Sequence, residues 1–371
     1  MAAAPVSLFG ARRRGPRVSV VVPVYNLAES LEACLDSVLA QRGIGAIEVV
    51  AVDDGSTDGS GDLLDRYAAR HPEVRVVHQA NGGVSRARNH ALELCTGFYV
   101  TFVDPDDVVP PGGWAPLVRS LDRTGSDFAV GMMERVGVDG RRSRPPLLAR
   151  NHAVARPKVS IDEAPLLIAD VFPCNKLFRL DFWRGAGLGF PVDLRYEDQV
   201  FATEAFLAAR RFDVLTEVVY DWHVRDDLSS ATQRRARLDN LADRMTTKQM
   251  SLERVVRHGN AELTDLFYRE VLPIDMWEHF RAAVAPGTDQ PEDYWRLLRD
   301  GLRAIWNEST VPFEDTAVPP AQRLMGWLTA HDRRDDLARL IAEIDGPGVP
   351  VVDGIYQHPW RDASGVPEIR A

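Results

Sequence analysis

The chain has few cysteines for its length. Only three of its 371 residues are cysteines, and Cys34, Cys95 and Cys174 lie far apart. A structural zinc site needs closely spaced pairs of ligands, and a disulfide framework needs an even set of cysteines. Three isolated thiols fit neither pattern. We therefore expect reduced cysteines, as in a cytosolic enzyme.

The sequence also has no long apolar run. No stretch approaches the roughly 18 to 20 apolar residues that cross a bilayer. Residues 1–16 lack the pattern of a secretory signal, and we expect them to form a flexible N-terminus. The expected location is therefore the cytoplasm. Peripheral contact with the inner face of an anionic membrane stays open, because basic runs occur at Arg12–Arg14, Arg141–Arg142 and Arg234–Arg235.

Positive charge is in deficit. The chain has 44 Lys and Arg against 54 Asp and Glu, which gives a formal net charge of −10. Nucleic-acid binding depends on concentrated cationic side chains that neutralise phosphates. We therefore expect no nucleic-acid partner.

Strand and helix patterns alternate in the first hundred residues. Between the apolar runs lie segments with apolar residues at helical spacing, and the runs cover residues 18–25, 47–52, 74–78 and 98–103. Such alternation predicts an α/β fold with a parallel sheet. Ligands of open α/β sheets bind beyond the carboxyl ends of the strands, so the polar residues that follow these runs are the candidate site.

The densest polar cluster is Asp104-Pro-Asp106-Asp107, directly after the fourth run. Carboxylates this close repel one another, and they stay ionised together only when water or a divalent cation lies among them. Mg²⁺ or Mn²⁺ suits such ligands. The alternative is an acidic turn that caps the next helix.

Two other clusters are expected at the same edge, one at Asp53-Asp54-Gly55 and one that begins at Asn81. Asp54 can accept a hydrogen bond from a base N–H, and Arg88 can face phosphate. A metal on Asp106 can neutralise a pyrophosphate. Together these residues predict a nucleotide diphosphate site, whereas Asp53 and Asp58 are expected only to shape the turn.

Four motifs resemble, in this order, those of the inverting family 2 glycosyltransferases of GT-A fold, over roughly the first 225 residues. The motifs are Val21–Asn26, Val52–Asp58, Asn81–Asn89 and Val103–Asp107. The resemblance implies a Rossmann-like GT-A domain at residues 17–230. A mainly helical region at 231–371 would follow, loosely resembling bacterial cell-envelope and teichoic-acid enzymes. The expected boundary falls between Asp226 and Arg237.

The resemblance also implies roles for single residues. Pro23, Tyr25 and Asp54 would border the nucleotide base, with Asn81 and Arg88 completing the base and phosphate environment. Asp104 would approach the ribose and Asp106 would bind Mn²⁺ or Mg²⁺. A later segment would supply Arg225 and Ser229 to the phosphates and His223 to the metal. For His223 the alternative is an ordinary hydrogen-bonded side chain.

The catalytic residues would come from Arg195-Tyr196-Glu197-Asp198-Gln199, which resembles the family's Glu-Asp pair. An inverting transfer needs one carboxylate to take the proton of the acceptor hydroxyl, and Asp198 is the predicted base. Three roles stay open for Glu197: orienting Asp198, holding an acceptor hydroxyl, or acting as the base. Acidic residues at a helix N-terminus are the compatible structural reading.

Other segments carry less specific signals. Phe172–Arg179 resembles a segment before the acceptor site, and the Arg- and Pro-rich residues 141–158 are predicted to form a loop beside it. Helical patterns dominate after residue 237. There we expect tryptophans to pack in a core rather than stack on sugars, namely Trp277, Trp295, Trp306, Trp327 and Trp360.

These observations predict a metal-dependent, inverting hexosyl- or N-acetylhexosaminyl-transferase. Its donor would be a nucleotide diphosphate sugar, in the first place a UDP-sugar, and its acceptor a hydroxyl of a glycan or polyol-phosphate polymer. A homo-oligomer stays open. One alternative is a non-catalytic protein that binds nucleotide sugars. Another is a nucleotidyltransferase, although Pro23–Asn26 is not the Gly-rich basic loop that such enzymes usually carry after the first strand.

Overall fold

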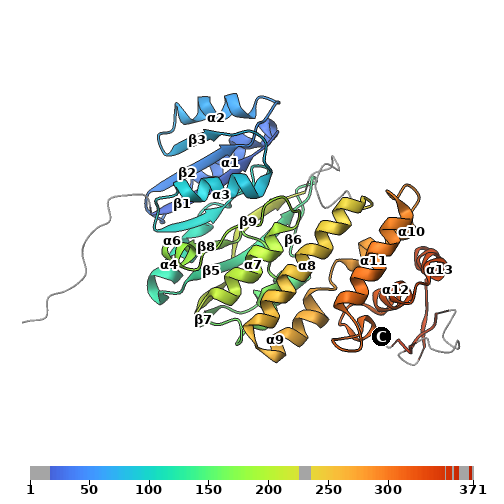
Figure 1. Cartoon of the computed structure of the whole chain (residues 1–371). Coiled ribbons are helices and arrows are strands. Elements are labelled where there is room, and N and C mark those ends of the chain that lie inside the picture. Colours follow the sequence, from blue (N-terminus) through green and yellow to red (C-terminus); the bar gives the residue numbers. More distant parts are fainter. Residues whose placement is uncertain (1–16, 225–234, 347, 353–354, 359–366, 370–371) are drawn as a thin grey trace, which may run out of the picture.

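The computed structural model describes residues 17–224, 235–346, 348–352, 355–358 and 367–369 (Figure 1). The expected flexible segment 1–16 lies outside this part of the chain. So do the two predicted phosphate ligands Arg225 and Ser229, as well as Trp360. The predicted domain boundary also falls largely among residues outside the described ranges, and it stays a prediction.

A mixed sheet forms the centre of the described part (Figure 1). Its strand order is β3-β2-β1-β4-β8-β5-β9-β7, with β6 paired to β5. The strands are β1 (Val18–Val24), β2 (Ile47–Asp53), β3 (Val74–His78), β4 (Tyr99–Phe102), β5 (Phe128–Val136), β6 (Arg142–Ser143), β7 (Arg156–Val159), β8 (Lys176–Arg179) and β9 (Phe212–His223). The first four strands match the apolar runs of the sequence, and they pair in parallel as predicted.

The register brings the carboxyl ends of these strands level. Val24 at the end of β1 lies opposite Asp53 at the end of β2, and Asp53 lies opposite His78 of β3. Three helices make the crossovers: α1 (Ala28–Leu39), α2 (Ser60–Ala68) and α3 (Val84–Leu94). The polar residues after β1, β2 and β4 therefore share one edge of the sheet, as parallel strands require.

Alternate residues of β1 point into two different cores, as the period of a strand requires. Val20 and Val22 belong to a core that is covered by α1, α2 and α4 (Trp114–Thr124). Val21 belongs to the core on the other face, with α3 and two later helices, α6 (Leu180–Gly185) and α7 (Glu197–Ala208). Both faces of the sheet are thus buried, which explains the near-continuous apolar runs.

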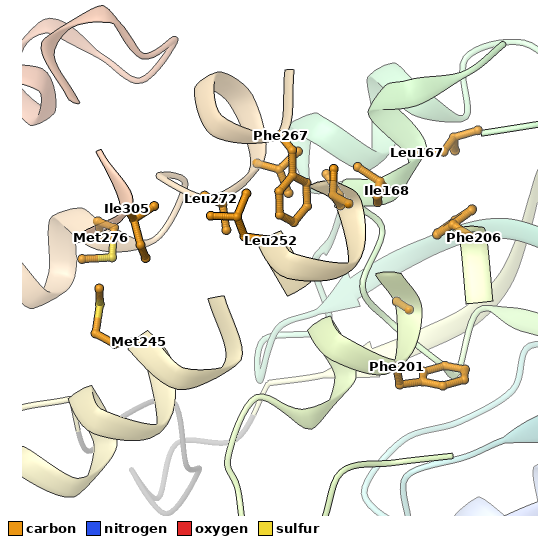
Figure 2. Packing of buried hydrophobic residues seen from close by; sticks show 14 of the residues in the cluster. Leu167, Ile168, Phe201, Phe206, Met245, Leu252, Phe267, Leu272, Met276 and Ile305 are labelled. Carbon is orange, nitrogen blue, oxygen red and sulfur yellow. The ribbon is translucent and has the colours of Figure 1, made fainter. Parts of the chain in front are cut away.

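The second core continues into the C-terminal helices. Figure 2 shows Phe201 and Phe206 of α7, Leu252 of α8 and Phe267, all of which belong to this one cluster. The helices are α8 (Leu238–His258), α9 (Ala261–Leu266), α10 (Met276–Val284), α11 (Pro291–Ile305), α12 (Pro320–Ala330) and α13 (Arg334–Asp345), and a π-helical turn at Phe267–Val271 follows α9. This confirms the predicted helical region. Trp295, Trp306 and Trp327 are buried in it.

The prediction of a loop at residues 141–158 was wrong. This segment contains β6, the helix α5 (Pro146–Asn151) and most of β7. β7 is an edge strand, where Pro157 is tolerated and where the side chains gain little burial. The sequence of such a strand therefore shows no clear alternation of apolar and polar residues. Arg142 is an exposed residue of this segment, and its guanidinium pairs with the buried Asp221, at 2.6 and 2.8 Å.

Within the described residues, no helix has both the length and the apolar character needed to cross a bilayer.

Candidate active site

A cavity of about 920 Å³ opens at the shared edge of the sheet. Its wall brings together eight of the residues that the motifs had singled out: Pro23, Tyr25, Asp54, Asn81, Arg88, Asp104, Asp106 and Glu197. Residues 193–196 and Trp222 complete much of the remaining wall. Asp198 and His223 are described by the structure but do not line this cavity.

Asp54 orders the loop that follows β3. Its buried carboxylate accepts hydrogen bonds from the backbone N–H groups of Gly82 and Gly83, at 2.9 and 2.8 Å, and from Gln79 Nε2 at 2.7 Å. Gly83 has φ of 86°, a conformation that favours glycine. Asp54 thus holds Asn81 at the cavity edge. Motif reasoning missed this role, because nothing local in the sequence pairs Asp54 with backbone groups 28 residues away.

Asp53 and Asp58 stabilise the neighbouring turns. Asp53 accepts a hydrogen bond from the Ser56 N–H at 3.0 Å and contacts His78 Nδ1 at 2.9 Å. Asp58 accepts one from the Ala28 N–H at the start of α1, at 3.0 Å. These contacts match the turn-shaping role that the sequence left open for them.

Arg88 of α3 connects three of the motifs. The side chain is buried, and its Nη1 donates to Glu197 Oε1 while its Nη2 donates to Asp104 Oδ1, both at 2.8 Å. Its guanidinium also lies 5.0 Å from the centre of the Phe190 ring. Burial opposes its charge, but Asp104 and Glu197 outweigh that effect and raise the pKa of Arg88. In this geometry the terminal nitrogens of Arg88 bind carboxylates, and the predicted phosphate contact stays a prediction.

Asp107 ties the acidic turn to β9. Its buried carboxylate accepts from Tyr220 Oη and from the His223 N–H, both at 2.7 Å. Burial and the neighbouring Asp104 and Asp106 raise the pKa of Asp107. All three carboxylates of the turn line the cavity, where the buried Asp107 anchors the turn and Asp104 and Asp106 are partly exposed.

The residues for a metal are incompletely assembled. Within the ranges that the structure describes, no group of three or more His, Cys, Asp or Glu side chains is arranged to hold a metal ion. The donor set of the acidic turn still fits Mg²⁺ or Mn²⁺, because these ions take carboxylate oxygens and leave other positions to water and to substrate phosphates. Asp106 lines the cavity, whereas His223 is placed by its backbone contact with Asp107.

The Glu-Asp pair forms the start of α7. Tyr196 precedes the helix with φ of 62°, and Asp198 Oδ1 accepts from the Gln199 N–H at 2.8 Å. Burial raises the pKa of both Glu197 and Asp198, against the opposing charge of Arg88. The two carboxylates therefore lie at a helix N-terminus, as the structural alternative from the sequence predicted. This position is compatible with a catalytic role.

The segment expected before the acceptor site contains a buried ionic network. Lys176 Nζ lies 2.8 Å from Asp170 Oδ1, and the side chains of both residues are fully buried. Asp170 also contacts Asn175 Nδ2 and, at 3.0 Å, His152 Nε2. Although burial opposes ionisation, Lys176 and His152 lower the pKa of Asp170 to about 2. Asn175 and Lys176 thus fix the segment Phe172–Arg179 through their buried contacts with Asp170.

Replacing Asp170 with asparagine should destabilise the protein by about 3–5 kcal/mol, because it leaves the buried Lys176 without its anionic partner. Denaturant unfolding of the variant would measure this. The matched control is Asp181→Asn, which removes an exposed partner of Arg179 and should cost at most about 1 kcal/mol. Equal stability of the two variants would contradict the structural role of the network.

A nine-stranded mixed sheet with crossover helices and a carboxylate-lined cavity at the ends of its parallel strands has the architecture of the GT-A fold. Residues 19–184 match the sequence model of the family described as "Glycosyl transferase family 2", and this region belongs to that family. The resemblance seen in the motifs is thereby confirmed.

Similar proteins include bacterial glycosyltransferases. The uncharacterized glycosyltransferase EpsJ of Bacillus subtilis is 34% identical over 221 residues, which are 59% of this chain and 63% of EpsJ. The poly(ribitol-phosphate) beta-glucosyltransferase of Bacillus spizizenii is 28% identical over 215 residues, 57% of this chain and 33% of that protein. The chain therefore spans less than two thirds of the length of either relative.

A solved structure shares the fold over nearly the whole chain. The crystal structure of S. aureus TarS 1–349 matches 96% of this chain and 99% of that chain, with a TM-score of 0.70 and 21% identity. TarS 1–349 has also been solved in complex with UDP-GlcNAc. That structure matches 96% of this chain and 99% of its own with a TM-score of 0.62 and 22% identity. The likeness includes the helical region.

Proposed function

We propose that this protein transfers a sugar, with inversion, from a UDP-sugar to a hydroxyl of a cell-envelope glycan or polyol-phosphate polymer. One observation carries the proposal: Arg88 joins Asp104 of the acidic turn to Glu197 of the Glu-Asp pair in the wall of a single cavity. A donor site and a catalytic pair are thus adjacent. Two findings support this assignment: residues 19–184 match the family 2 glycosyltransferase model, and one relative is a poly(ribitol-phosphate) beta-glucosyltransferase.

The donor nucleotide would lie along β1 and the loop after β3. Tyr25 is 49% exposed at the cavity wall and offers an aromatic face to a base. Asp54 and Asn81 offer acceptors and donors beside it. A cavity of about 920 Å³ is large enough for a nucleotide sugar, since ligand pockets generally measure about 300–1,000 Å³.

Asp106 would hold Mn²⁺ or Mg²⁺, with His223 as a further candidate ligand. The cation would stabilise the diphosphate as it departs, so no second acid has to protonate the leaving group. Asp104 has a different task, because it shares Arg88 with Glu197 and so fixes the acidic turn relative to the catalytic pair.

Asp198 would be the base. It takes the proton of the acceptor hydroxyl while that oxygen bonds to the anomeric carbon and the bond to the diphosphate breaks. Glu197 is a poorer candidate, because its carboxylate is ion-paired with Arg88 at 2.8 Å. Asp198 lies next to the cavity wall rather than in it. That position suits a group that acts on the acceptor and not on the donor.

The test is a calorimetric screen of UDP, GDP, CDP and dTDP sugars with and without Mn²⁺, followed by transfer assays on poly(ribitol-phosphate) and glycan acceptors. UDP-GlcNAc is the first donor to try, because TarS has been crystallised with it. We expect one UDP-sugar to bind, and to bind more tightly with Mn²⁺. Binding of no nucleotide sugar would overturn the proposed function, and binding without any turnover would favour a non-catalytic sugar-nucleotide binder.

A further inference from the structure

The turn that carries the Glu-Asp pair is held from outside the GT-A sheet, by α8. Arg195 Nη1 lies 2.7 Å from Asp243 Oδ2, and Arg195 Nη2 lies 2.9 Å from Asp239 Oδ2. Tyr196 Oη donates to Asn240 Oδ1 at 2.8 Å. α8 runs alongside α7 (Figure 1), so one helix of the C-terminal region contacts both residues that precede the Glu-Asp pair.

The turn needs such support. Tyr196 has φ of 62°, in the left-handed region that residues other than glycine rarely adopt. A backbone in that conformation persists only where its surroundings fix it. Tyr196 is the residue directly before Glu197, so any relaxation of its backbone would turn both carboxylates. The contacts to Asn240 and Asp243 are therefore placed where they can control the geometry of the pair.

Arg244 adds a fixed charge to this contact. Its guanidinium lies 4.4 Å from the centre of the Tyr196 ring and pairs with Asp275. Asp275 in turn binds the fully buried Lys248, at 2.7 Å. The Arg244 side chain is thus held between the catalytic turn and a buried ionic group of the helical region.

The charge of Arg244 reaches Asp198. The charged groups that act on Asp198 include Glu197, Asp104, Arg88 and Arg244, together with the buried Lys176. Burial raises the pKa of Asp198, while Arg244 and Arg88 lower it. Arg88 is already shared between two other carboxylates, and Lys176 is paired with Asp170, so Arg244 is the cation near Asp198 that acts from the helical region.

We propose that α8 positions the catalytic pair, with Asn240, Asp243 and Arg244 acting through Arg195 and Tyr196. These three are positioning residues, because they touch the turn and not the substrates. The inference rests on the proposed function, and it assigns a task to the helical region: the region completes the active site of the GT-A domain by fixing the residues that carry the base.

The first experiment measures hydrogen exchange of the full-length protein over residues 193–199. Asp243→Asn and Asn240→Ala should each speed exchange in this turn about tenfold or more, since local opening governs exchange. The matched control is Arg281→Met. Arg281 likewise pairs with a carboxylate, Asp345, and stacks on an aromatic ring, that of Trp277, but away from the turn. Unchanged exchange in the Asp243 and Asn240 variants would overturn the inference, whether or not transfer is detected.

The second experiment follows transfer against pH. Arg244→Met should lower kcat about 10- to 100-fold and change KM for the UDP-sugar less than about twofold, because the donor site is intact while the base is misplaced. Loss of the cation raises the pKa of Asp198, so the acid limb of the kcat profile should move to higher pH. In Arg244→Lys the acid limb of the kcat profile should return to its wild-type pH, because the cation is kept. In Arg281→Met the acid limb should stay at the wild-type pH.

The two experiments separate the possible failures. An active wild-type enzyme whose acid limb is the same in Arg244→Met would overturn the role of α8 and leave the proposed function standing. If Arg244→Met does not fold, Asp243→Asn decides the matter: its kcat should fall with little change in KM, and hydrogen exchange over residues 193–199 should be faster. Wild-type protein that transfers no sugar would overturn the proposed function, and the exchange measurement would still decide whether α8 holds the turn.

Discussion

Replacing Asp198 with asparagine should lower the rate of sugar transfer by about 10²- to 10⁴-fold and leave donor binding unchanged, because the variant loses only the proton acceptor. The side chain keeps its shape and can still accept a hydrogen bond from the Gln199 N–H. Donor affinity should persist, since Asp198 does not line the cavity. Transfer rates and calorimetric affinities for the UDP-sugar, measured on the same preparation, test both parts of this expectation.

A matched control comes from the same helix. Glu204→Gln changes a carboxylate of α7 that pairs with Arg254 away from the cavity, and it should leave transfer within about twofold of wild type. A further comparison with Glu197→Gln locates the base. If Asp198→Asn remained active while Glu197→Gln lost transfer and kept its donor affinity, the assignment of the base would pass to Glu197.

Replacing Asp106 with alanine should remove the Mn²⁺-dependent part of donor binding. Changes outside the direct ligands of a metal typically cost 10- to 100-fold in affinity, so loss of a direct ligand should cost at least about 100-fold. Titration of the UDP-sugar with and without Mn²⁺ gives this directly: the two affinities should differ in the wild type and coincide in the variant.

The neighbouring Asp107 provides the control. Its carboxylate is bonded to Tyr220 Oη and to the His223 N–H, so Asp107→Asn should mainly destabilise the fold, by about 1–3 kcal/mol. Donor binding by the folded Asp107 variant should still respond to Mn²⁺. An Asp106 variant that kept its full metal response would show that the cation is held by other residues.

Much of the candidate site was predictable because its residues follow strands that the sequence marks clearly. The runs that became β1, β2 and β4 are apolar and buried, and parallel pairing forces their carboxyl ends to one edge. Asp54 and Asp106 come within four residues of those ends. Their presence in one cavity therefore follows from local patterns and one topological rule.

Contacts between distant segments could not be predicted in this way. Nothing near Arg88 in the chain indicates that it divides its hydrogen bonds between Asp104 and Glu197, which lies 109 residues away. The pairing of Lys176 with Asp170 is similarly hidden, because a Lys within an otherwise ordinary segment does not reveal that it will be fully buried. The edge strand β7 was missed because burial, which produces the apolar period, is nearly absent there.

The sequence by itself therefore determined the order of strands and helices in the first hundred residues, the mainly helical region after residue 237 and the carboxylates of the acidic turn. These features depend on periodicity and on residue type, which are local. Only the tertiary structure decided how the charges pair and that α8 contacts the turn before Glu197. The physical reason is that the strength of an ion pair, and the stability of a strained backbone, depend on burial and on the contacting partners. Segments far apart in the chain supply both.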